Sequence, residues 1–140
     1  MDRDTFKLIH SELIMQVQTI EQDLRIIYAA MKDGDFEKNF EVLENASMGK
    51  IINTLRDLDH SDGKPVLQEQ DYQLLNQIRE IRNYWAHQCY LDFVYIEDND
   101  EREERFQEVA NKLHYDENRT WDLHERMEKL RLKMINKYLD

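Results

Sequence analysis

The stretch DTFKLIHSELIMQVQTIEQDLRIIYAAMK, residues 4–32, decides the fold because it is long, amphipathic and free of Gly and Pro. Its apolar side chains recur at alternating spacings of three and four, which is the repeat of one helix face. These positions are Phe6, Ile9, Leu13, Val17, Ile20, Leu24, Ile27 and Met31. Asp4 is a suitable N-cap and Gly34 a suitable stop, so we predict one packing helix over about 4–32.

The rest of the chain also has a helical composition. Charged residues make up 35% of its 140 residues, and Gly and Pro together occupy only four positions (3 + 1). Further helices are predicted from about 35 to 43, 47 to 58, 68 to 96 and 101 to 138, the last divisible at the polar stretch 114–119. The stretch HSDGKPV, residues 60–66, is the clearest loop. We therefore predict one all-α domain over residues 1–140, an up-and-down bundle of four to five helices.

Charge and cysteine content limit the function classes. A net charge of −11 weighs against a broad nucleic-acid surface, although it leaves room for a small basic site or a basic partner. Cys89 is the only cysteine, so an intrachain disulfide and a Cys-rich zinc site are excluded. No apolar run resembles a signal peptide or a membrane span. We expect a cytoplasmic protein in a reducing compartment, without membrane association.

Patterns that hold a metal or a cofactor are missing from the sequence. His124 and Glu125 lack the second His of a His-Glu-x-x-His zinc site. Glu-x-x-His repeats of di-iron bundles are absent, and the three glycines are isolated rather than gathered in a phosphate loop. We expect neither a metal nor a cofactor.

The predicted helix 68–96 has two apolar faces. On a wheel of about 100° per residue, one face is expected against the core and comprises Leu74, Ile78, Ile81, Trp85, Cys89 and Ile96. Tyr84, Leu91 and Val94 lie well away from it. Since a surface helix needs only one apolar stripe, this helix is either central in the bundle or meets a second subunit.

A polar strip lies on the second side of this helix. Arg79, Asn83 and His87 are spaced by four, and Tyr90 follows close to the same line. Arg82 lies about 140° from His87, so both line one groove only where a neighbouring helix or subunit closes it. Arg79 and Tyr90 are candidate substrate-binding residues.

These residue types suit cleavage of RNA without a metal, in which the ribose 2′-hydroxyl attacks the adjacent phosphate. Arg binds phosphate through a planar fork, and His transfers protons near neutral pH. Asn can hold a phosphate oxygen or fix the imidazole. The reaction needs a base and an acid, which a twofold dimer would supply as two copies of His87. The same spacing also arises in an ordinary charged helix, with a structural His87 and a solvated Arg82.

The string RNYWAH, Arg82 to His87, resembles the R-x4-H motif of HEPN domains, in which a polar residue, often Asn, follows the Arg. The preceding LLNQIREIRN (residues 74–83) and the earlier ASMGKIINTL (residues 46–55) also resemble sequences of that family. The resemblance covers most of the chain, and the R-x4-H motif is its most specific part.

The resemblance implies an all-α bundle that dimerises, with the two motifs facing each other in a cleft. Many family members are metal-independent endoribonucleases of toxin–antitoxin, phage-defence or RNA-processing systems. Carried over by position, His87 would transfer the proton, Arg82 would contact the phosphate and Asn83 would position it. The implied partners are a second copy, an RNA substrate and an antitoxin or other protein. Toxins paired with a nucleotidyltransferase carry Tyr two residues after the His, where Cys89 stands here and Tyr90 comes one residue later.

Two other hypotheses remain open at this point. The chain could keep the HEPN-like fold without activity and bind a protein or nucleotide partner through the groove or its acidic surface. It could also be a helical interaction protein unrelated to the family, with the second apolar face as its only functional surface.

Overall fold

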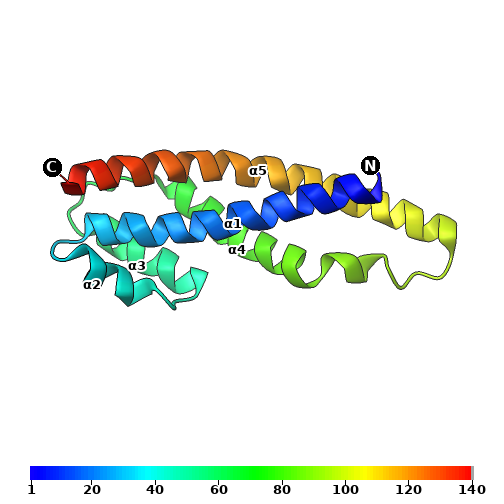
Figure 1. The fold of residues 1–140 in the computed structure, drawn as a ribbon, viewed down its shortest axis with the longest axis horizontal. Helices are drawn as coiled ribbons and strands as arrows, with labels where there is room; N and C mark the ends of the chain where they lie inside the picture. Colours follow the sequence, from blue (N-terminus) through cyan, green and yellow to red (C-terminus); the bar gives the residue numbers. More distant parts are fainter. Residues whose placement is uncertain (140) are drawn as a thin grey trace.

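The computed structural model describes residues 1–139, and this range is all-α with no strand (Figure 1). The predicted fold class is therefore confirmed. The elements are α1 (Arg3–Met31), α2 (Phe36–Leu43), α3 (Met48–His60), α4 (Glu69–His87), the short 3₁₀ helix η1 (Cys89–Asp92) and α5 (Asn99–Leu139).

Successive α-helices alternate in direction, as expected of an up-and-down bundle (Figure 1). Because the chain makes five passes, α1 and α5 run parallel, with α4 antiparallel to both. The ion pairs Arg3–Glu103 and Asp23–Arg131 follow this parallel register along the two helices. The α1–α5 contact is the most extensive in the molecule.

The bundle narrows about halfway along its length. Helices α2 and α3 are short and cover only the end of the bundle that holds the C-terminal half of α1 (Figure 1). Beyond them, α1 packs only against the end of α4, η1 and α5. We call the place where α3 begins, beside the middle of α4, the step.

Side-chain caps set most helix starts. Asp35 and Ser47 cap α2 and α3 with their side chains, so these helices begin near 35 and 47, as predicted. The predicted cap of α1 is wrong by two residues, because Asp2 rather than Asp4 accepts the hydrogen bond from the Thr5 N–H (2.7 Å). Gly34 lies beyond the end of α1, in the left-handed conformation (φ 105°) that favours glycine.

Helix α5 runs for 41 residues without interruption, so the division considered near 114–119 does not occur. The polar residues that break the apolar pattern there make hydrogen bonds inside the bundle instead. Buried Asp116 accepts from the Trp85 indole (2.8 Å), and Glu117 accepts from Gln16 (3.0 Å).

The predicted helix 68–96 is wrong beyond residue 87, because α4 ends at His87. Gln88 leaves the helical conformation (φ −121°, ψ −32°), and the chain continues through η1 into a turn. The rings of Tyr90 and Phe93 pack on Phe6 of α1, with centroids 5.8 and 6.2 Å away. This aromatic packing overrides the helical pattern, so the wheel positions assigned beyond His87 do not apply.

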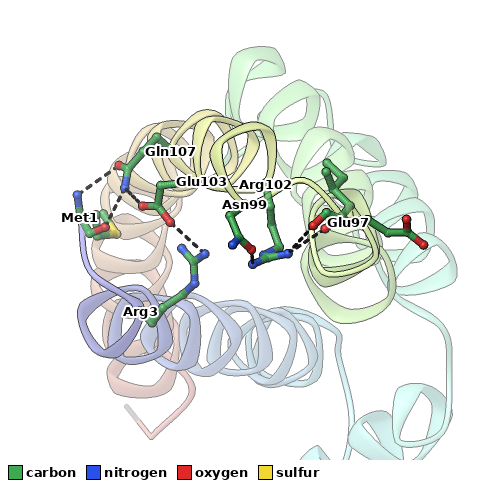
Figure 2. A network of polar contacts seen from close by, with 8 residues as sticks. Met1, Arg3, Glu97, Asn99, Arg102, Glu103 and Gln107 are labelled. Atoms are coloured by element: carbon green, nitrogen blue, oxygen red, sulfur yellow. Dashed lines mark hydrogen bonds and ion pairs between the residues drawn. The ribbon is translucent and has the colours of Figure 1, made fainter.

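Polar contacts fasten the start of α1 to the first turns of α5 (Figure 2). The N-terminal amine of Met1 donates to Gln107 (3.2 Å), and Arg3 pairs with Glu103 (3.1 Å). On the other side, Arg102 donates to two carbonyl oxygens of the turn that precedes α5. These contacts hold the connection between η1 and α5 against α1.

Buried Asp59 organises the loop between α3 and α4. Its carboxylate accepts from the N–H groups of Val66 (2.7 Å) and Leu67 (3.1 Å) and from the Tyr72 hydroxyl (2.6 Å). Burial and this hydrogen bond raise the pKa of Tyr72, which keeps the hydroxyl protonated as a donor.

We predict that Asp59→Ala lowers the free energy of unfolding by about 3 kcal/mol, because three donors lose their acceptor. Urea denaturation followed by circular dichroism measures this loss. The matched control is Asp57→Ala, an exposed carboxylate two residues away, which should change stability by less than about 0.5 kcal/mol. Equal losses in both variants would contradict the role given to Asp59.

Candidate functional site

An open groove of about 480 Å³ lies at the step between α3 and α4. It brings together two of the stretches that carry the HEPN resemblance, residues 46–55 and 74–83. The lining residues are Ser47, Met48, Gly49, Lys50, Asn53, Thr54, Asp57, Arg79, Arg82 and Asn83. Three basic side chains and one acidic side chain line it, so the groove is locally basic in an acidic protein.

The start of α3 is shaped to receive Arg79. The Ser47 hydroxyl accepts from the Lys50 N–H (3.3 Å) and caps the helix. A Cβ on residue 49 would lie only 2.7 Å from Nη1 of Arg79, closer than real Cβ contacts come. Gly49 therefore leaves room for the guanidinium to lie against the first turn of α3.

Arg82 reaches the groove from the side of α4 that faces α1. Its Nη1 donates to Glu21 Oε2 of α1 (3.3 Å), and the other Glu21 oxygen accepts from Arg25 (3.2 Å). The Arg82 side chain is 35% exposed and that of Glu21 16%. The ion pair holds the guanidinium at the groove and offsets part of its charge.

Asn83 and His87 lie on the exposed side of α4, one turn apart. Asn83 lines the groove, whereas His87 does not line it. His87 is the last residue of α4 and lies beyond the step. Together with exposed Arg79, these residues form the strip that helical spacing predicts.

Tyr90 does not continue this strip. It lies in η1, and its ring packs against Phe6 and His10 of α1, with centroids 5.8 Å from each. Burial raises the pKa of the Tyr90 hydroxyl, and the electrostatic effect of the nearby Cys89 raises it further. The prediction placed Tyr90 on the strip because it extended α4 past His87.

His10 supports the motif from α1 and had no signal in the sequence. Its Nε2 lies 2.7 Å from the carbonyl oxygen of Trp85, inside the R-x4-H string. The Cys89 thiol donates to the same oxygen (3.4 Å), and burial raises its pKa. Cys89 is buried, as expected, although it lies in η1 rather than on the predicted helix.

The basic lining gives the groove the chemistry of an anion site. The arginine and lysine donors of the groove can bind a phosphate, and the exposed imidazole of His87, outside the groove, can exchange a proton with a reacting hydroxyl. Over residues 1–139 no group of three or more His, Cys, Asp or Glu side chains is placed to hold a metal ion.

In the same range no helix combines the length and apolarity needed to cross a membrane.

Comparison of the chain with models of protein families, with curated proteins and with solved structures finds no match.

We predict that the two motif residues differ in their effect on stability. Arg82→Ala removes a half-buried ion pair and a packed stem, so the free energy of unfolding should fall by about 1 kcal/mol. His87→Ala removes an exposed side chain and should change it by less than about 0.5 kcal/mol. Urea denaturation of both variants measures the difference. A larger loss for His87→Ala would mean that His87 is a structural residue.

Proposed function

We propose that this protein is a HEPN-type endoribonuclease that acts as a homodimer without a metal. The observation that carries the proposal is the placement of Arg82 and Asn83 in a basic groove, with exposed His87 one turn beyond Asn83 on the same helix. The resemblance of the R-x4-H string to the family's motif supports the same assignment.

In the proposed reaction the ribose 2′-oxygen attacks the adjacent phosphorus, and the bond from phosphorus to the 5′-oxygen breaks. The products are a 2′,3′-cyclic phosphate and a 5′-hydroxyl. His87 of one protomer takes the proton from the 2′-hydroxyl, and the partner's His87 gives one to the leaving oxygen. Arg82 stabilises the charge that develops on the phosphate, and Asn83 positions it.

A second copy is required because one chain has a single imidazole on the strip. The segment after His87 supports dimerisation, since three apolar side chains there are largely uncovered. Leu91 is 53% exposed, Val94 49% and Tyr95 78%. A partner covering them would lie next to the C-terminal end of α4, where His87 stands.

The biological setting that we propose is a cytoplasmic toxin or phage-defence effector. The net charge of −11 suits such a role, because it confines RNA contact to the groove and leaves an acidic surface for a basic antitoxin or other protein.

We predict metal-independent cleavage of RNA in EDTA that is lost in His87→Ala and leaves cyclic-phosphate ends. Gel analysis of labelled RNA with mass spectrometry of the ends tests this. Because His87 is exposed, urea denaturation should show that the variant folds normally. Sedimentation should give a dimer at micromolar concentration. Absence of cleavage by the wild type on several RNAs, or a monomer, would count against the nuclease.

The second candidate function is a catalytically inactive module that binds a protein or nucleotide partner. The observation that favours it is the ion pair between Arg82 and Glu21, which offsets the charge of the motif arginine.

Glu21→Gln separates the two candidates. If the groove acts on RNA, removing the carboxylate beside Arg82 should tighten RNA binding by about threefold, in keeping with the few tenths to 1 kcal/mol of a partly exposed pair. Fluorescence anisotropy measures the affinity, and Glu12→Gln, an exposed position on α1, is the matched control. Absence of RNA binding in the wild type and both variants would favour the inactive module.

A further inference from the structure

We propose that the groove holds a second, non-scissile phosphate of the RNA strand, bound by Arg79 and Lys50 against Gly49. This inference rests on the proposed function for the identity of the ligand as RNA. It adds a binding subsite, next to Arg82, that would fix the strand before the reaction.

In the described part of the chain, Arg79 differs from most arginines of this protein in having no acidic partner, and Lys50, like the other lysines, has none. Within residues 1–139 neither makes an ion pair with a carboxylate, whereas Arg82 is paired with Glu21. In a chain with 30 acidic and 19 basic residues, two unpaired cations in one groove leave charge available for an anion.

Arg79 lies beside Gly49, where no side chain obstructs its guanidinium. The absent Cβ of residue 49 would lie 2.7 Å from Nη1, 3.4 Å from Cζ and 3.8 Å from Cδ of Arg79. The guanidinium therefore lies along the first turn of α3, and a planar fork placed in this way can donate two hydrogen bonds to one phosphate.

The first turn of α3 adds donors to the same place. Its N–H groups have no acceptor within the helix, and Ser47 accepts from only one of them, that of Lys50. No acidic residue lies in this turn to compete with an anion. The helix start thus supports the phosphate that Arg79 and Lys50 would hold.

The arrangement leaves room for one nucleotide unit beside the reacting one. Arg79 and Arg82 are three residues apart, which is about 4.5 Å along the axis of α4. The cavity of about 480 Å³ is of the size that takes a small organic group. Asp57 lines the groove as well, and it disfavours a further phosphate near its carboxylate.

The test uses a fluorescently labelled 2′-O-methyl RNA, which binds but cannot be cleaved because its nucleophile is blocked. Fluorescence anisotropy compares the wild-type protein with Arg79→Ala and Gly49→Ala. Arg105→Ala is the control, since it removes the same charge from an exposed position on α5 outside the groove. Thermal unfolding of each variant is measured alongside.

Arg79→Ala should weaken binding by about tenfold, a difference of about 1.4 kcal/mol, and should reduce the slope of log affinity against log salt by about 0.7. Gly49→Ala should also weaken binding, because the added methyl displaces the guanidinium. Its melting temperature should be unchanged or higher, since Ala is the better helix former and only a flexible side-chain tip must move. Arg105→Ala should bind within about twofold of the wild type.

Wild-type affinity in Gly49→Ala, or a loss in Arg79→Ala no larger than that in Arg105→Ala, would overturn the subsite. No binding of the oligonucleotide by the wild type would do so as well. The proposed nuclease activity can fail while the subsite holds. In that case ordinary RNA would not be cleaved, but binding of the oligonucleotide would still be weakened by Arg79→Ala and Gly49→Ala.

Discussion

The hydrogen bond from the Trp85 indole to buried Asp116 (2.8 Å) is the contact on which the candidate site depends. Trp85 is 1% exposed, and its carbonyl oxygen is also bonded to His10, so this one residue ties α4 to both α1 and α5. Because Trp85 stands between Arg82 and His87 in the motif, its burial fixes the rotation of α4 about its axis. Once that rotation is fixed, the residues on the opposite side must face outward.

The helical architecture could be predicted because its signals are local. The apolar period of α1 and the starts of α2 and α3 near 35 and 47 are each predicted from a few neighbouring residues. The end of α4 could not be predicted, because no Gly or Pro marks it. Tyr90 and Phe93 lie outside the helix and pack on Phe6, which is more than 80 residues earlier in the chain. The neighbouring residues give no indication of this long-range contact. The division considered within α5 has a similar cause. Asp116 and Glu117 interrupt the apolar pattern because they accept hydrogen bonds from other helices.

The same division between local and distant contacts applies to the site. The strip of Arg79, Asn83 and His87 follows from spacing within one helix. The partner of Arg82 does not, since Glu21 lies 61 positions away on α1. The groove forms because α3 begins beside Arg79, and this proximity could not be predicted from the sequence. The space that Gly49 leaves for the guanidinium is likewise visible only in the folded structure.

The net negative charge of the chain and the positive charge of the groove have opposite effects on a polyanion such as RNA. Under the proposed function, phosphates outside the groove would meet a protein of charge −11, so a strand would be held only where Arg79, Lys50 and Arg82 compensate that repulsion. Salt weakens the groove contacts and the surrounding repulsion alike, within about 8 Å at physiological ionic strength. Net salt dependence should therefore be shallower than the number of basic contacts alone implies.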